Sequence, residues 1–195
     1  MFVFLASFII FVLILNYFIR KSNQNHESSQ DDFWEREQKA NFSRRKDISN
    51  LGYITIPSET IPQNLHTDAE KTLLELSSKK LLNLTGITNT ELKLQYGAAN
   101  LDALSEYDSN FTTFVRTVPV YAKELMDAGQ TENARQLLEF AVSCRADSRS
   151  IYTQLAGLYR QSGQSDKIQE LVRSAEGLSS LDGPVIVEKL KSYLP

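Results

Sequence analysis

The side chains that most often carry acid–base or nucleophilic chemistry are few and scattered in this sequence. The single cysteine, Cys144, follows an apolar run from Leu137 to Val142, where a small buried hydrophobic residue is expected rather than a reactive thiolate. A thiol nucleophile needs a neighbouring base, but His26 lies in a polar stretch and His66 beside a predicted helix start. Neither histidine has a second ligand at metal-binding spacing. We therefore expect no catalytic residue and no metal site.

Carboxylate pairs are the remaining candidates for chemistry. Glu70 with Glu75 and Glu132 with Glu139 fall on predicted helices, where acidic side chains usually form a solvated face. The chain has no phosphate-binding glycine loop, no G-x-S-x-G and no H-E-x-x-H. These absences predict a protein that is not an enzyme, with no cofactor and no small-molecule substrate.

Composition narrows the class of protein further. The chain has 195 residues, is 23% charged and 42% hydrophobic, and carries a formal net charge of −3. These values are typical of a globular protein, and they lack the basic footprint of a nucleic-acid binder. One cysteine cannot form an intramolecular disulfide, which fits a reducing compartment.

The first 19 residues predict a transmembrane helix that contacts the lipid bilayer. Up to Leu15 the only polar side chain is that of Ser7, and Arg20 and Lys21 follow the apolar stretch. A helix of this length rises about 28 Å, close to the thickness of a hydrocarbon core. A cleaved secretory signal is the alternative, but no basic residue precedes the stretch and no A-x-A-like site follows it.

Charge asymmetry predicts the orientation of this anchor. Basic residues lie only on its C-terminal side, at Arg20 and Lys21 and again from Arg44 to Lys46. The positive-inside rule then places the N-terminus outside and the C-terminal domain in the cytoplasm, at the cell membrane. Three N-x-S/T triplets, at Asn41, Asn83 and Asn110, have no meaning on that side of the membrane.

Residues 20–66 are predicted to be a juxtamembrane tether. Residues 22–32 contain no apolar residue and should be a flexible stalk, and a short helix should begin at Asp31 or Asp32. The aromatic residues Trp34 and Phe42 of that helix either dock onto the globular domain or lie on the membrane surface. Residues 51–57 should be extended, because isoleucines alternate there with polar residues before a proline.

Residues 67–195 are predicted to be helical. Thr67 to Glu70 is a capping box that opens a helix whose leucines continue to Leu84, with Gly86 ending it. A second capping box at Thr88 opens a shorter helix that Gly97 should stop. The next helix should begin at Asp108 or Ser109, and Pro119 inside it predicts a kink or a restart.

Two segments in the C-terminal third repeat each other. Gly129 and Gly163 are separated by 34 residues. The second segment reads Tyr152-x2-Leu155-Ala156-x2-Tyr159-x3-Gly163-x4-Ile168-x3-Val172-x2-Ala175, and the first reads Val118-x2-Tyr121-Ala122-x2-Leu125-x3-Gly129-x4-Ala134-x3-Leu138-x2-Ala141.

This pattern resembles the tetratricopeptide-repeat family, whose period is 34 residues. The resemblance covers residues 115–182 and implies an α-solenoid of antiparallel helix hairpins, with repeats at 115–148 and 149–182. Tyr152 and Val118 replace the usual tryptophan, Ile168 replaces a small alanine, and no proline closes either repeat. A plain helical bundle is the alternative.

A final helix should cap the stack after Pro184, with Val185, Val187, Leu190 and Leu194 on its buried side. The whole arrangement, with Trp34-Glu35-Arg36-Glu37 beside the anchor, also resembles a group of bacterial single-pass proteins. That second resemblance implies no activity.

In tetratricopeptide stacks the first helix of each hairpin lines a groove that receives a protein or peptide partner. The resemblance therefore implies a protein-binding adaptor or scaffold; the alternative is a structural or self-associating subunit of a membrane complex. The residues expected to line the groove are Arg116, Lys123, Met126, Asp127, Thr153, Gly157, Arg160 and Gln161. Because Arg116, Lys123 and Arg160 are basic, we expect an acidic or helical segment as the partner.

Overall fold

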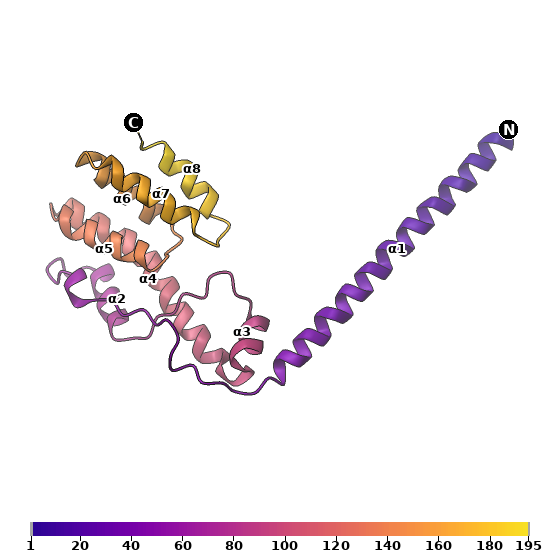
Figure 1. The fold of residues 1–195 in the computed structure, drawn as a ribbon, viewed down its shortest axis with the longest axis horizontal. Coiled ribbons are helices and arrows are strands. Elements are labelled where there is room, and N and C mark those ends of the chain that lie inside the picture. Colours follow the sequence, from indigo (N-terminus) through magenta and orange to yellow (C-terminus); the bar gives the residue numbers. More distant parts are fainter. Residues whose placement is uncertain (1, 195) are drawn as a thin grey trace. The chain divides into compact units, whose positions relative to one another are not determined.

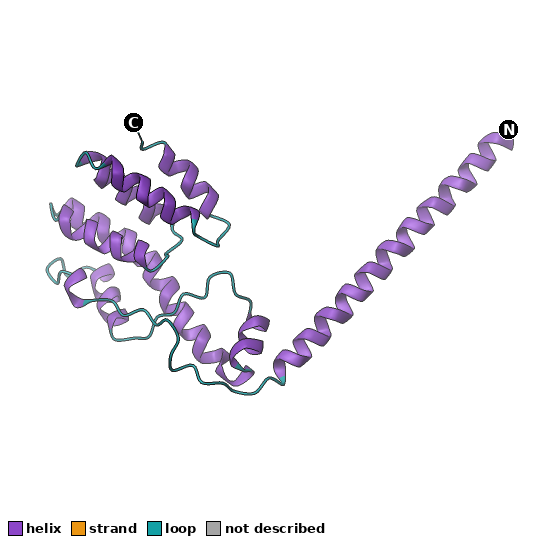
Figure 2. Cartoon of the chain, viewed as in Figure 1, coloured by secondary structure: helices purple, strands orange, loops and turns teal. Residues whose placement is uncertain are grey.

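The computed structural model describes the backbone from residue 2 to residue 194, and all side chains except those of residues 1–10, 13, 19–20, 22–29 and 195. The described chain is helical, with loops between the helices and no strand (Figures 1 and 2). This confirms the predicted all-α class. The chain divides into two compact units, Met1–Lys46 with Asn89–Ala99 and Asp47–Thr88 with Asn100–Pro195.

In the first unit, helix α1 (Phe2–Asn41) packs by its C-terminal end on helix α3 (Asn89–Tyr96). Ala40 is fully buried there. The carboxylate of Glu37 accepts hydrogen bonds from Thr90 and from Lys93, whose Nζ lies 3.2 Å away. These hydrogen bonds, led by that from Thr90, lower the pKa of Glu37. The hydroxyl of Ser43 donates to the carbonyl of Lys93 at 2.6 Å and extends the contact past the helix end.

Gly97 ends α3, as its position predicts. Its φ is +93°, a left-handed conformation that glycine adopts without steric cost. A Cβ at this position would also overlap the backbone of Arg44, which runs directly against it. The N–H of Lys46 donates to the carbonyl of Tyr96 at 3.0 Å. Glycine is thus required here both by conformation and by close approach of a second chain segment.

The predicted flexible stalk is wrong at the level of the backbone. Residues 22–32 belong to the continuous helix α1, so the short helix expected from Asp31 or Asp32 is the end of a longer one. Helix formation is cooperative and this stretch contains no glycine or proline to stop it. Polarity alone was a poor predictor of coil.

Trp34 and Phe42 do not dock onto a domain, which contradicts the first of the two predicted alternatives. Their exposed fractions are 67% and 80%, and Phe33 beside Trp34 is also exposed. The face of α1 that packs on α3 carries Glu37 and Ala40 instead. The large aromatic side chains therefore lie on the solvent side of the first unit.

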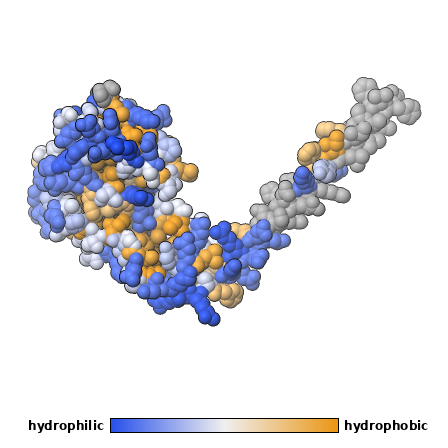
Figure 3. Space-filling model, in the orientation of Figure 1, coloured by the Kyte–Doolittle hydropathy of each residue, from blue (hydrophilic) through white to orange (hydrophobic). Residues whose placement is uncertain are grey.

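The predicted membrane-spanning segment, residues 1–19, lies mostly outside the residues whose side chains are described. Within the described part of the chain, no helix is both long enough and apolar enough to cross a bilayer. The described side chains from Phe11 to Phe18 are nonetheless uncovered, and their apolar members form the hydrophobic patch visible on α1 in Figure 3.

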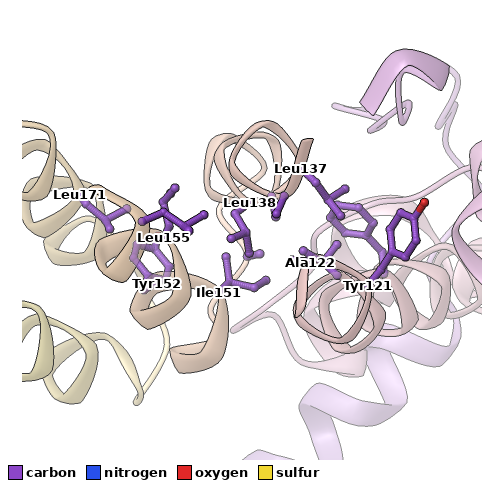
Figure 4. Packing of buried hydrophobic residues seen from close by; sticks show 14 of the residues in the cluster. Tyr121, Ala122, Leu137, Leu138, Ile151, Tyr152, Leu155 and Leu171 are labelled. Carbon is purple, nitrogen blue, oxygen red and sulfur yellow. The ribbon is translucent and has the colours of Figure 1, made fainter. Parts of the chain in front are cut away.

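In the second unit, five helices follow one another as neighbours: α4 (Leu101–Asp127), α5 (Thr131–Ser143), α6 (Arg149–Gln161), α7 (Ser165–Glu176) and α8 (Gly183–Lys191). Each packs on the next, and α6 also packs on α4 and α8 (Figure 1). Their buried residues form one core. Figure 4 shows Leu138 of α5 beside Ile151 of α6, and Leu155 of α6 facing Leu171 of α7.

Two glycines close the turns between α4 and α5 and between α6 and α7. Gly129 and Gly163 have φ of +77° and +70°. In each turn the following residue donates its N–H to a carbonyl five positions back at 2.8 Å, Gln130 to Leu125 and Gln164 to Tyr159. This pattern is the Schellman motif, in which a left-handed residue satisfies the last carbonyls of a helix. The predicted role of both glycines is confirmed.

Helix α4 begins earlier than predicted. It starts at Leu101, after the short 3-10 turn η2 (Ala98–Asn100), rather than at Asp108 or Ser109. The predicted restart at Pro119 is also wrong, because α4 continues through it to Asp127. The buried residues Leu104, Phe111 and Val118 recur every seven positions and form one continuous face. Packing of that face outweighs the hydrogen bond that proline removes.

Helix α2 (Asp68–Ser77) packs on α4 and ends well before the predicted limit at Leu84. The hydroxyl of Ser77 bonds back to the carbonyl of Leu74, which competes with continuation of the helix. Leu81 and Leu84 are buried, but as an extended segment. Ile54 donates its N–H to Leu81 at 2.9 Å, which makes one isolated antiparallel bridge of the predicted extended strip. A 3-10 turn, η1 (Ser58–Thr60), contacts α5.

Helix α8 packs on α6 and α7, but its predicted buried face is partly wrong. Ile186 and Leu190 are fully buried, whereas Val185 is 42% exposed. Val187 and Leu194 contact the core from partly buried positions. Since α8 begins at Gly183 with proline in its first turn, the helical phase differs by one residue from the predicted one.

Candidate functional site

The first helices of the two hairpins, α4 and α6, share a groove of about 460 Å³. Its lining residues are Pro119, Val120, Lys123, Glu124, Asp127, Ser150 and Gln154. Val120 is 52% exposed, which is unusual for a large aliphatic side chain between two helices. The groove combines this apolar centre with charges of both signs.

Two of the eight predicted groove residues lie in this lining, Lys123 and Asp127. The other six are on α4 or α6 but outside the lining: Arg116, Met126, Thr153, Gly157, Arg160 and Gln161. The structure therefore brings only part of the predicted set together.

Sequence reasoning missed Val120, Glu124, Ser150 and Gln154. A signal for two of them was present, since Val120 and Lys123 lie three residues apart, and Ser150 and Gln154 four apart, on single helix faces. Choosing the α6 residues by charge rather than by helical phase selected the wrong face. Glu124 also changes the electrostatics, because it adds a second carboxylate beside the single lysine of the lining.

Gln154 ties α6 to α4 inside the groove. Its Nε2 donates to the carbonyl of Pro119 at 3.1 Å. A carbonyl oxygen only accepts, so this contact fixes the orientation of the side-chain amide. In the described part of the chain, Oε1 of Gln154 is then a buried acceptor without a hydrogen-bond donor. Such an acceptor is costly unless a donor reaches it.

Glu124 is held in place from the other side. The hydroxyl of Thr67, which caps α2, donates to its carboxylate at 2.7 Å. The same Thr67 oxygen accepts the N–H of Glu70 at 3.2 Å, as the predicted capping box requires. Glu124 is therefore positioned by the start of α2 and does not depend on a partner for its geometry.

The expectation that Glu70 is solvated is wrong. Only 4% of it is exposed, and it accepts hydrogen bonds from the backbone N–H groups of Leu65 and His66 and from the hydroxyl of Tyr121. Burial raises the pKa of Glu70, but these three hydrogen bonds outweigh it and lower the pKa overall. Burial and the neighbouring Glu70 raise the pKa of Tyr121, whose hydroxyl also donates to the carbonyl of Pro62. This cluster fastens the segment before α2 to α4.

A second polar cluster joins α5, α6 and α7 around Glu139. The hydroxyl of Tyr159 donates to its carboxylate at 2.7 Å, and Nζ of Lys167 lies 3.5 Å from the same oxygen. Arg135 pairs with both Glu139 and Glu132. The hydrogen bond from Arg135 lowers the pKa of Glu132 to about 2. The cluster connects the second helix of one hairpin to both helices of the next.

The candidate nucleophile and base lie apart from any such arrangement. Cys144 ends α5, packs against the core from a half-buried position, and burial raises its pKa. His66 is exposed, with a left-handed backbone at φ +57°. In the described part of the chain, no three His, Cys, Asp or Glu side chains are grouped so that they could hold a metal ion.

Comparison with protein-family models, with curated proteins and with solved structures returned no match to this chain.

Proposed function

We propose that this chain is a membrane-anchored protein-interaction module, which holds a segment of a partner protein in the groove between α4 and α6. The observation that carries the proposal is that the first helices of two successive hairpins share one groove with an exposed apolar centre at Val120. Exposed apolar surface framed by polar residues is typical of protein–protein contact sites.

The repeated turn geometry supports a tetratricopeptide-like arrangement for these hairpins. Gly129 and Gly163 end α4 and α6 with the same conformation and the same hydrogen bond. The helix α8 then packs on both helices of the second hairpin, where a further repeat would otherwise continue. Its outer side carries Glu188 and Lys189, both exposed, which suits a terminal capping element.

The uncovered apolar surface of α1 supports membrane anchoring. At 100° per residue its described apolar side chains point to all sides of the helix, and they are Phe11, Val12, Ile14, Leu15, Tyr17 and Phe18. A helix that is apolar all round needs an apolar environment on every side. We propose that the lipid bilayer supplies it for residues 1–19, with the C-terminal domain on the cytoplasmic side because Arg20 and Lys21 follow directly.

We propose a binding role rather than a catalytic one because the reactive groups are poorly placed for catalysis. The raised pKa of Cys144 disfavours the thiolate that a nucleophile requires. Glu70, Glu139 and Tyr159 are engaged in contacts that join helices to one another. The polar clusters of this chain stabilise the stack that forms the groove.

The groove is tested by affinity purification of the full-length chain from detergent-solubilised membranes. We expect Val120→Asp to abolish recovery of a distinct partner protein, because it places a charge at the apolar centre of the groove. The matched control is Val185→Asp on α8, another exposed valine outside the groove, which should recover the partner as well as the unchanged chain. Equal recovery with Val120→Asp would overturn the proposal, and recovery of this chain alone would favour self-association.

Anchoring and orientation are tested separately. Alkaline carbonate should leave the full-length chain in the membrane pellet and release a variant that begins at Lys21. In a Cys144→Ser background, a cysteine at the exposed Gln30 should resist an impermeant thiol reagent in intact cells and react after lysis. Labelling of intact cells would contradict the cytoplasmic orientation, and carbonate release of the full-length chain would contradict the anchor.

A further inference from the structure

We propose that the segment bound between α4 and α6 carries a lysine or arginine side chain, so that the groove selects a basic rather than an acidic partner. The inference rests on the proposed function and concerns the chemistry of its ligand. It reverses the expectation drawn from the sequence, which counted Arg116, Lys123 and Arg160 as groove residues.

The charges of the lining carry the first step. Of the charged residues in the groove, Glu124 and Asp127 are acidic and Lys123 is basic. Neither Arg116 nor Arg160 is part of the lining. The two carboxylates lie three residues apart on α4, where side chains share one face of a helix. A cation placed in the groove therefore meets two anionic groups from a single surface.

The two signs of charge differ in how firmly they are held. Glu124 is partly buried and fixed by the hydrogen bond from Thr67 at 2.7 Å. Lys123 is exposed, and no ion pair holds it among the described residues. A lysine head on a flexible four-carbon stem leaves the groove at little cost, whereas a fixed carboxylate cannot. The permanent electrostatic feature of the groove is thus negative.

The free acceptor of Gln154 carries the second step. Its Nε2 is committed to the carbonyl of Pro119, so Oε1 is the atom without a donor. A ligand that donates an N–H beside this amide would satisfy an acceptor that α4 and α6 leave unsatisfied. Ligand carboxylates cannot do this, because they only accept. Both Gln154 and the two carboxylates therefore favour a ligand rich in donors.

Val120 fixes the rest of the ligand's character. Its exposed aliphatic surface lies among these polar groups in the same lining. A short polypeptide segment with an apolar side chain next to a basic one would cover Val120 and place its cation near Glu124 and Asp127. Such a segment offers main-chain N–H groups to Gln154 at the same time.

The probes are two synthetic libraries of peptides of about twelve residues, identical except for a fixed central lysine in one and a fixed central glutamate in the other. Binding to the full-length chain in detergent micelles is measured by fluorescence polarisation. We expect the lysine library to bind about tenfold more tightly, and this preference to shrink as salt screens the carboxylates. Charge removal by Glu124→Gln with Asp127→Asn should weaken the best lysine peptide about tenfold.

A matched control makes the same change of net charge elsewhere. Asp166→Asn with Glu170→Gln removes two exposed carboxylates from α7 and should leave binding unchanged. Gln154→Leu should weaken the lysine peptide, and methylation of one peptide N–H should abolish that weakening if this N–H reaches Oε1. Lys123→Gln should strengthen binding of the lysine peptide.

The outcomes separate this inference from the proposed function. Tighter binding of the glutamate library, lost on Lys123→Gln, would overturn the basic preference while leaving the groove as a binding site. Equal binding of both libraries would also overturn it. If Val120→Asp changes the binding of neither library, the proposed function itself fails.

Discussion

Gly129 and Gly163 occupy equivalent positions in two successive hairpins, with φ of +77° and +70° and the same 2.8 Å hydrogen bond across each turn. Neither glycine has a neighbouring atom within 4 Å of where a Cβ would be. Backbone conformation, rather than space, is therefore the reason for glycine at both sites. Arg145 ends α5 in the same way, with φ +56° and the N–H of Ala146 donating to Ala141 at 3.1 Å.

Alanine at either glycine should destabilise the second unit by a similar amount. Gly129→Ala and Gly163→Ala each force a side chain into the left-handed region, which costs about 1 kcal/mol. Urea unfolding in detergent micelles, followed by circular dichroism, measures this loss. Gly157→Ala is the control, because Gly157 lies inside α6 without positive φ and with open space at Cβ. It should be neutral or stabilising, and an equal loss there would refute the conformational explanation.

Gly97→Ala should disrupt the packing of α1 on α3, because its Cβ would overlap the backbone of Arg44. We expect faster cleavage by trypsin after Arg44 and Arg45, with the second unit unchanged in stability. Gly86→Ala is the matched control, since Gly86 has φ +85° but open space at Cβ. Similar cleavage rates for both variants would show that steric overlap at Gly97 is unimportant.

Glu70→Gln should destabilise the chain at neutral pH by about 1–3 kcal/mol, the usual effect of impairing a buried hydrogen-bonded charge. The carboxylate accepts from Leu65, His66 and Tyr121, and the amide can replace only part of this. The free energy of unfolding from urea titrations measures the change. Glu75→Gln on the exposed side of the same helix should change it little.

Acid should weaken the same cluster in a defined direction. The pKa of Glu70 is lower in the folded chain than its ordinary value of 4.5, so the folded state favours the ionised form. Its contribution is complete above about pH 4.5 and is lost as the pH falls through the folded pKa. Unfolding free energies measured between pH 7 and pH 3 should therefore fall less steeply for Glu70→Gln than for the unchanged chain. Identical slopes would mean that Glu70 is not the titrating group.

Tyr159 and Glu139 should be energetically coupled across the two hairpins. Their hydrogen bond is 2.7 Å long, and Lys167 lies over the ring of Tyr159 at 5.2 Å. A double-mutant cycle of Tyr159→Phe and Glu139→Gln should give a coupling energy of about 1 kcal/mol, because both groups are partly screened by water. Additive losses within about 0.3 kcal/mol would show that the contact does not join the hairpins.

The hairpins were predictable because two independent signals agree in the sequence. The helical period of the buried residues and the glycines at 129 and 163 both depend on local conformation, which a single segment determines. The same local information predicts the cap at Thr67 and the end of α3 at Gly97.

The errors fall where tertiary contacts override local preference. Leu81 and Leu84 continue a helical pattern, yet they are used in an extended segment whose N–H groups bond to Tyr107 and Asp108 on α4. Glu70 looked like a surface carboxylate because its donors lie in a preceding loop. The groove depended on which faces of α4 and α6 meet, and charge pattern in one chain segment does not contain that information.

The central claim, that the α4–α6 groove holds another protein at the membrane, is tested most directly by photo-crosslinking in native membranes. A photoreactive residue in place of Val120 should give one discrete adduct with a different protein, and the same residue in place of Val185 should not. Adducts that contain only this chain, or the same adduct from both positions, would contradict the claim.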